Sequence, residues 1–154
     1  MAKKNLFSSS FRLQGTDGIR SEARRAKLKD RSGPIRMFVE RGIITDQFME
    51  LYVYAWARNL ENRQLNNPKK SIIVGWDPRD TEGVFSRAVI RGIRKAGATA
   101  LVAGVVPTPL VPMMVVDMKA AGGVMITASH NPMDQNGIKL FSGYRGLKFL
   151  PAND

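Results

Sequence analysis

The sequence has no cysteine, a single histidine and few aromatic residues. Without cysteine the chain can form no disulfide framework, no thiolate metal site and no cysteine nucleophile. This composition suits a reducing compartment, so a cytoplasmic location is expected. No run of about 20 apolar residues is present, and the charged N-terminus is not followed by the apolar stretch of a secretory signal. We therefore expect no membrane span.

Acidic residues are also scarce, because 13 aspartates and glutamates accompany 24 lysines and arginines and leave a net charge of +11. Such a charge can bind nucleic acid or attract small anions such as phosphates. The excess is concentrated early, and we interpret 21–42 as a basic, solvated and partly flexible insertion. Two other interpretations stay open: a surface for a specific polyanion, and an acidic complement in a missing part of a longer protein. No recognition motif accompanies the charge, so a nucleic-acid-binding module is kept only as an alternative.

The remaining composition is that of a globular protein, and 154 residues with 44% hydrophobic content suffice for a single domain over 1–154. A helical pattern begins near Thr45, which can cap it, and ends at 66–68. Its apolar face is expected to pack against a sheet and to consist of Phe48, Leu51, Tyr52, Ala55 and Leu60, widened by Met49 and Trp56.

Short apolar runs and helical patterns then alternate to the end of the chain. Strands are expected at 71–76, 98–103, 124–127 and 137–141, with 147–150 as a pairing partner for the last, and helices at 84–96 and 110–119, the first ending at Gly97. This alternation indicates an α/β fold, a three-layer α/β/α domain with a mostly parallel, mixed sheet. In such sheets ligands bind at the loops that follow the carboxyl ends of strands.

One of these loops, Thr127-Ala128-Ser129-His130-Asn131-Pro132, carries several reactive side chains. We expect Asn136-Gly137 to turn the chain so that Lys139 returns toward it. A serine near a lysine and an imidazole can perform nucleophilic or phosphoryl-transfer chemistry. A capped turn without chemistry is the alternative from the residues alone. A Ser-His-Asp triad is disfavoured because adjacent serine and histidine side chains rarely point at each other.

Three motifs, in the same order, resemble those of the α-D-phosphohexomutases, the family of phosphoglucomutases and phosphomannomutases. They are Gly15-Thr16-Asp17-Gly18-Ile19-Arg20, Val74-Gly75-Trp76-Asp77-Pro78-Arg79, and the 127–132 loop followed by Asn136-Gly137-Ile138-Lys139. The resemblance covers nearly all of 11–150. It implies the N-terminal domain of a four-domain enzyme that interconverts hexose 1-phosphate and hexose 6-phosphate through a phosphoserine and a hexose 1,6-bisphosphate intermediate.

The resemblance also implies roles for individual residues. Ser129 would carry the phosphoryl group, and its phosphate would be a ligand of Mg²⁺. Lys139 would contact the transferring group or take part in proton transfer, and Arg20 would reach the phosphoserine region, so that both also bind substrate. His130 would either act directly or orient the loop.

Other family features concern the surroundings of the site and the substrate. Asp77 and Arg79 are expected to shape a loop near the site. Phosphoglucosamine mutases tend to have serine where this chain has Thr127, so glucose and mannose phosphates are the expected substrates. Phosphoglucosamine mutase and an inactive domain kept for assembly or regulation are the alternatives.

Three loops of the family lie in domains that this sequence lacks: an aspartate-rich Mg²⁺ loop, a sugar-recognition loop and a phosphate-binding loop. The resemblance therefore implies that the remaining Mg²⁺ ligands belong to missing domains of the same polypeptide. Alone, the domain is expected to be inactive.

Overall fold

The computed structural model describes residues 18–27, 30, 32–63, 70–143 and 145–148, without the side chains of 61–63. Residues 15–17 of the first motif and 149–150 of the last expected strand lie outside these ranges. The elements are β1 (Ile19–Arg24), α1 (Pro34–Arg41), β2 (Ile43–Thr45), α2 (Asp46–Arg63), β3 (Ser71–Trp76), α3 (Val84–Lys95), β4 (Thr99–Val105), α4 (Leu110–Asp117), β5 (Gly122–Ile126) and β6 (Gln135–Ser142).

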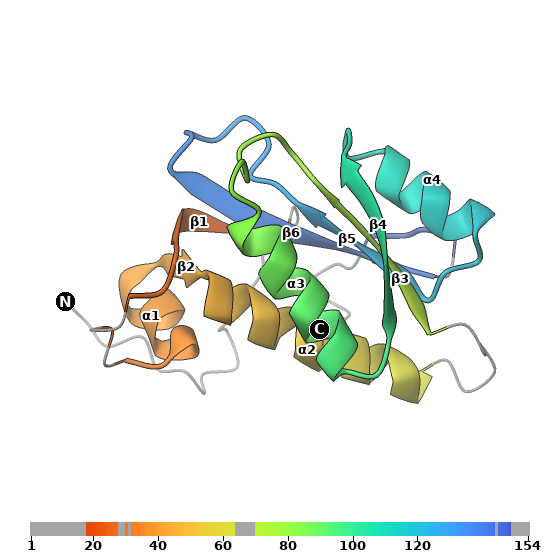
Figure 1. Ribbon diagram of the computed structural model, residues 1–154, viewed down its shortest axis with the longest axis horizontal. Helices are drawn as coiled ribbons and strands as arrows, with labels where there is room; N and C mark the ends of the chain where they lie inside the picture. Colours follow the sequence, from red (N-terminus) through yellow and green to blue (C-terminus); the bar gives the residue numbers. More distant parts are fainter. Residues whose placement is uncertain (1–17, 28–29, 31, 64–69, 144, 149–154) are drawn as a thin grey trace.

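The strands form one mixed sheet in the order β2-β1-β6-β5-β3-β4 (Figure 1). β3 runs parallel to both β4 and β5, and β1 runs parallel to β2. β6 is antiparallel to both of its neighbours, β1 and β5. It thereby joins the N-terminal pair of strands to the rest of the sheet, and the expected mixed sheet is confirmed.

Helices cover both faces of the sheet, which confirms the three-layer α/β/α arrangement (Figure 1). Val74 and Val124 point toward α2 and α3, whereas their neighbours Ile73 and Met125 point toward α4. Because β3 and β5 are buried on both faces, they read as continuous apolar runs in the sequence. Among the described residues, no helix is long and apolar enough to cross a membrane.

α2 begins at the expected cap, since the Thr45 hydroxyl accepts a hydrogen bond from the Phe48 amide at 3.1 Å. Its expected apolar face is partly wrong: Leu51 is 40% exposed and Ala55 is also exposed. α3 packs across α2, and this contact shifts the buried face of α2 away from the expected one. The buried face consists of Phe48, Met49, Val53, Trp56, Ala57 and Leu60.

The contact between α2 and α3 depends on Gly92. A Cβ atom at this position would lie 2.4 Å from the backbone carbonyl oxygen of Glu50, closer than van der Waals contact allows. The two helix backbones can approach this closely because no side chain separates them.

The basic segment 21–42 contains most of β1 and all of α1, neither of which the sequence pattern predicted. Arg24 forms a two-pronged ion pair with Asp30, at 2.9 and 3.1 Å. The hydrogen bond from Arg24, together with one from the Lys27 amide, lowers the pKa of Asp30 to about 2. The Ala26 amide donates to Asp46 at the start of α2, at 2.7 Å. Acidic side chains therefore anchor the described part of this segment.

The last strand also departs from expectation. β6 begins at Gln135, so Asn136 and Gly137 lie within the strand and do not turn the chain. The turn lies just before it, where the Gln135 amide donates to the Pro132 carbonyl at 3.0 Å. Of the expected partner strand, the described part contributes one bridge, between Phe141 and Lys148.

Candidate functional site

The 127–134 loop connects β5 to β6, two adjacent antiparallel strands, and stands at the carboxyl end of β5. β5 is buried along its whole length, as are Thr127 and Ala128. Ser129 and His130 are the first exposed residues after it. The sheet thus presents this serine at the edge where α/β proteins bind ligands.

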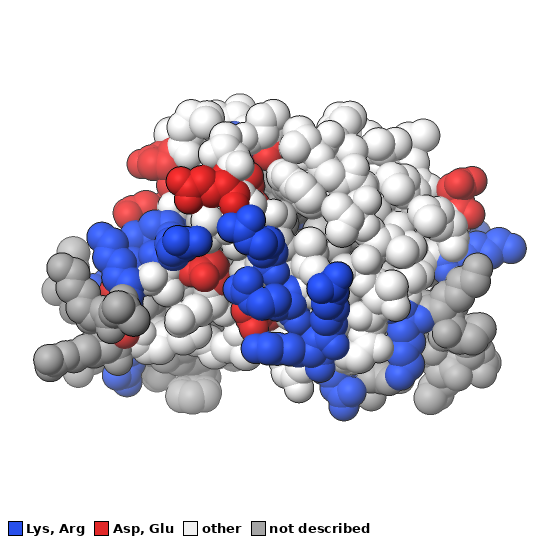
Figure 2. Space-filling model, viewed as in Figure 1, with Lys and Arg blue, Asp and Glu red and all other residues white. Residues whose placement is uncertain are grey.

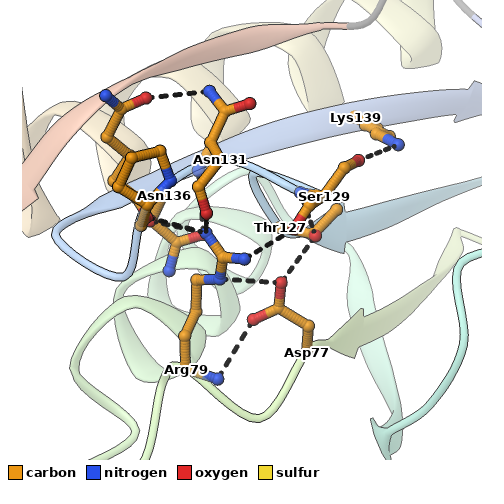
Figure 3. A network of polar contacts seen from close by, with 10 residues as sticks. Asp77, Arg79, Thr127, Ser129, Asn131, Asn136 and Lys139 are labelled. Atoms are coloured by element: carbon orange, nitrogen blue, oxygen red, sulfur yellow. Dashed lines mark hydrogen bonds and ion pairs between the residues drawn. The ribbon is translucent and has the colours of Figure 1, made fainter.

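The backbone of Ser129 is held in the left-handed conformation, with φ of 56°. For a residue other than glycine such a conformation costs on the order of 1–3 kcal/mol and persists only when the surroundings enforce it. The Ser129 amide donates to the Thr127 hydroxyl at 2.8 Å, and the Ser129 carbonyl accepts from Arg79 Nη2 at 2.6 Å (Figure 3). The backbone N–H and the backbone C=O of this strained residue therefore both have hydrogen-bond partners.

The Lys139 ammonium donates to the Ser129 hydroxyl at 3.0 Å (Figure 3). β6 makes this contact possible because its register sets Lys139 beside Met125, near the end of β5. The structure thus brings together the two residues that the sequence expectation had paired. The expected turn at 136–137 is wrong, and a regular strand brings Lys139 to the loop.

Arg79 binds the loop through its guanidinium group. Besides the Ser129 carbonyl, it reaches the Gln135 carbonyl at 2.9 Å, and it makes longer contacts of 3.4 Å with the carbonyls of Asn131 and Pro132. Its side chain is only 9% exposed. A single, largely covered arginine therefore joins the two ends of the loop, as the expected loop-shaping role requires.

Asp77, at the end of β3, orients this arginine. Its carboxylate accepts from Arg79 Nε at 3.0 Å and from the Thr127 hydroxyl at 2.6 Å. The next acidic residue, Asp80, accepts from the amides of Phe85 and Ser86 and so caps α3. The segment between β3 and α3 is thus fixed at both ends.

Arg20 lies on β1, directly across from Gly137 of β6. A Cβ atom at Gly137 would come within 3.0 Å of both the Arg20 side chain and the Thr127 carbonyl, and within 2.1 Å of the Ile19 carbonyl. Only glycine fits here, and its small size brings the stem of Arg20 against the backbone at the start of the loop.

The other two polar residues of the motif differ in their surroundings. His130 is exposed, and none of the hydrogen bonds among the described residues involves its imidazole. Thr127 is 3% exposed, and its hydroxyl both donates to Asp77 and accepts from Ser129. A serine hydroxyl could do the same, so the residue at 127 carries no direct information about the sugar.

A pocket of about 360 Å³ opens beside Ser129 between the ends of β3, β4 and β5. Its wall is polar at Asp77 and Thr108 and apolar at Val106 and Met125. This volume lies within the range of small-molecule sites.

The described residues contain no group of three or more histidine, aspartate or glutamate side chains that could hold a metal ion. The carboxylate of Asp77 is engaged by Arg79 and Thr127. Ser129 is the exposed oxygen that this site offers, so a phosphate on Ser129 fits the expected contribution of one ligand to Mg²⁺.

Comparisons with known proteins agree with this geometry. Residues 12–153 match the family model described as phosphoglucomutase/phosphomannomutase, alpha/beta/alpha domain I. The phosphoglucosamine mutase of Francisella tularensis subsp. novicida (strain U112) is 41% identical over 138 residues, which are 90% of this chain and 27% of that protein. The phosphoglucosamine mutase of Saccharopolyspora erythraea is 39% identical over 131 residues, which are 85% of this chain and 26% of that protein.

A solved structure described as a "putative phosphomannomutase" from Thermus thermophilus matches with a TM-score of 0.62 and 28% identity, over 85% of this chain and 25% of that one. The chain thus spans about a quarter of the length of the relatives that it matches. The motifs, the fold and these matches agree, and the chain belongs to the phosphoglucomutase/phosphomannomutase family, of which it represents the α/β/α domain I.

Proposed function

We propose that this domain supplies the phosphoryl-carrying serine of a phosphohexomutase, which interconverts hexose 1-phosphate and hexose 6-phosphate through a hexose 1,6-bisphosphate. The observation that carries the proposal is the 3.0 Å contact between Lys139 Nζ and Ser129 Oγ, in a loop at the carboxyl end of β5. Because the chain spans about a quarter of its relatives, the remainder of the site belongs to other domains.

Phosphoryl transfer from Ser129 breaks the bond between phosphorus and Oγ and forms one between phosphorus and a hexose hydroxyl oxygen, whose proton passes to a base or to solvent. Negative charge develops on Oγ as the bond breaks, and the ammonium of Lys139 is placed to stabilise it. The same ammonium can deliver a proton to Oγ. Arg20, on the neighbouring strand, adds a second positive charge for substrate phosphate.

Mg²⁺ would supply further neutralisation of phosphate charge when bound. Among the residues that the structure describes, the phosphate on Ser129 would be its ligand, since Asp77 is already engaged by its neighbours. The remaining ligands would come from another domain.

The relatives name two kinds of sugar. Phosphoglucosamine mutases are 41% and 39% identical to this chain, and a phosphomannomutase description accompanies the structure at 28% identity. Glucosamine phosphate is therefore a second candidate beside glucose and mannose phosphates. Thr127 is buried and so would not itself contact the sugar.

The test uses the full-length gene product with Mg²⁺ and a trace of the matching hexose 1,6-bisphosphate. Glucose, mannose and glucosamine 1-phosphates are supplied separately, and formation of each 6-phosphate is followed. We expect turnover of at least one sugar phosphate and none after Ser129→Ala. Mass spectrometry of the purified protein should find a phosphate on Ser129.

Ser32→Ala, which changes a serine near α1, is the matched control and should leave turnover unchanged. Undiminished turnover by the Ser129→Ala protein would contradict the role of Ser129. A wild-type protein that is phosphorylated nowhere and turns over none of the three sugars would contradict the proposal as a whole.

A further inference from the structure

We propose that Asp77, Arg79 and Thr127 form a positioning frame that holds Ser129 in its left-handed conformation and so aims its hydroxyl at Lys139. The inference rests on the proposed function, because it assigns positioning residues to the same reaction. None of the three needs to touch the substrate.

The frame is a closed ring of hydrogen bonds around one peptide. The Asp77 carboxylate accepts from the Thr127 hydroxyl, and that hydroxyl accepts from the Ser129 amide. On the other side the same carboxylate accepts from Arg79 Nε, and Arg79 Nη2 donates to the Ser129 carbonyl. The donor and the acceptor of the Ser129 backbone are thus both fixed to one carboxylate (Figure 3).

Two members of the ring have little exposed surface. Thr127 is 3% exposed, and the side chain of Arg79 is 9% exposed. Arg79 also binds the Gln135 carbonyl, where β6 begins, so the guanidinium fixes the serine relative to the strand that carries Lys139. The planar fork of arginine allows these contacts at once, whereas the single ammonium of lysine does not.

The direction of the Ser129 side chain depends on this backbone conformation. An L-residue other than glycine prefers negative φ, so removal of the frame allows Ser129 to relax from φ of 56°. The relaxed serine would point its hydroxyl away from the ammonium now 3.0 Å from it. A displacement of about 1 Å at a reacting group can reduce the rate about 100-fold.

Position 127 offers the sharpest test, because valine matches threonine in shape and lacks only the hydroxyl. In the full-length gene product we expect Thr127→Val to lower kcat about 100-fold and to change KM for the hexose 1-phosphate much less. Thr127→Ser keeps the hydroxyl and should retain most of the wild-type kcat. A role limited to general stability would not produce a selective loss of kcat that serine reverses.

Arg79 gives an independent measurement. Arg79→Ala should lower kcat by a similar factor, and added guanidinium ion should restore part of it. Arg79→Lys should not restore it. Arg91→Ala, which removes an arginine bound to a carboxylate on the far helix layer, is the control and should leave kcat unchanged.

A readout without turnover separates this inference from the proposed function. Hydrogen exchange of the Ser129 amide, followed by NMR, should be slow in the wild type and Thr127→Ser and fast in Thr127→Val. If the wild type is no mutase but this pattern holds, the proposed function fails and the frame stands. If Thr127→Val is folded and keeps both slow exchange and wild-type kcat, the frame is overturned. If Arg79→Ala does not fold, the comparison of Thr127→Val with Thr127→Ser decides whether the frame exists.

Discussion

Ser129 lies in the loop before β6, and Lys139 lies on β6. Because the two side chains are in contact, the charge of the lysine is the first property to test. We expect Lys139→Met in the full-length gene product to lower kcat by about 10²–10⁴, because the oxygen that leaves phosphorus loses its cation and proton donor. Initial rates with saturating hexose 1-phosphate measure this effect.

Lys95→Met is the matched control, since Lys95 is an exposed lysine that pairs with Glu50 on the helix layer. It should retain wild-type kcat. A Lys139→Met protein as active as this control would show that the ammonium has no part in the transfer.

Asp30 provides a prediction for pH. Its bond to Arg24 lowers its pKa to about 2, below the ordinary value of 3.8. When the pKa of a carboxylate is lower in the folded state than in the unfolded state, its charge stabilises the fold at pH values above the unfolded-state pKa. This stabilisation is lost as the pH falls toward the folded-state pKa. The wild type should therefore be more stable than Asp30→Asn at pH 5, and the difference should vanish between about pH 4 and pH 2.

Urea unfolding of both proteins across this pH range measures the difference. Glu22→Gln, which alters an exposed acid on the adjacent strand β1, should show no comparable loss. A gap between the wild type and Asp30→Asn that persists unchanged at pH 2 would contradict the assigned ion pair.

At the scale of elements, the crossing of α2 and α3 is the most restrictive contact. We expect Gly92→Ala to destabilise the fold by about 1–3 kcal/mol, because the new methyl group would overlap the Glu50 carbonyl and force the helices apart. Replacing glycine by alanine inside a helix usually increases stability, so a loss of stability here would be the opposite of the usual effect. Chemical denaturation measures it.

Gly33→Ala is the control, because nothing lies within 4 Å of a Cβ atom at that position. Gly33 is the N-cap of α1, so the effect on the free energy of unfolding should be at most about 1 kcal/mol and come from the cap alone. Equal stability of the two variants would mean that α2 and α3 do not approach as closely as described.

The elements that could be predicted from the sequence are those whose residues carry their own signal. β3 and β5 are largely apolar, and α3 has a clear apolar stripe that ends before Gly97. β1 was missed because it is polar, and pairing with β2 and β6 creates its place in the sheet. The face of α2 was partly misjudged because a neighbouring helix, and not periodicity alone, decides which side is buried.

The site was predictable in its residue types and only partly in its contacts. The order of the motifs predicted Ser129, Lys139 and Arg20 as site residues; the structure brings Ser129 and Lys139 into contact, and the catalytic roles stay predictions. It also suggested that Asp77 and Arg79 shape a loop. The Arg79 guanidinium binds carbonyl groups at least 50 positions away in the sequence. These contacts depend on the order of the strands in the sheet, which the local sequence does not contain. The left-handed conformation of Ser129 could not be predicted either, since serine has no preference for it.

At the scale of the whole molecule, the net charge of +11 raises the question of whether the domain binds a polyanion such as nucleic acid. Figure 2 shows basic side chains along α3, where Arg87, Arg91, Arg94 and Lys95 are all exposed. Two of them pair with Glu50, and the aromatic residue of α3, Phe85, packs against the core. We expect weak binding to duplex DNA at low salt that disappears near about 0.15 M salt.

Fluorescence anisotropy with two unrelated duplexes at several salt concentrations measures this. Arg87→Gln combined with Arg94→Gln should weaken the low-salt binding of both duplexes alike. A duplex that stays bound at physiological salt, or one strongly preferred over the other, would support a nucleic-acid partner instead.

The position of β6 between β1 and β5 also orders events during synthesis. Of the strands described in this sheet, β1 leaves the ribosome first, and β6, its partner toward the rest of the sheet, leaves last. Contacts between distant parts of a chain form late because they close long loops. A nascent chain without β6 can complete neither the sheet nor the pair of Ser129 and Lys139. We therefore expect Ser129 to meet the Lys139 ammonium only in the step that closes the sheet.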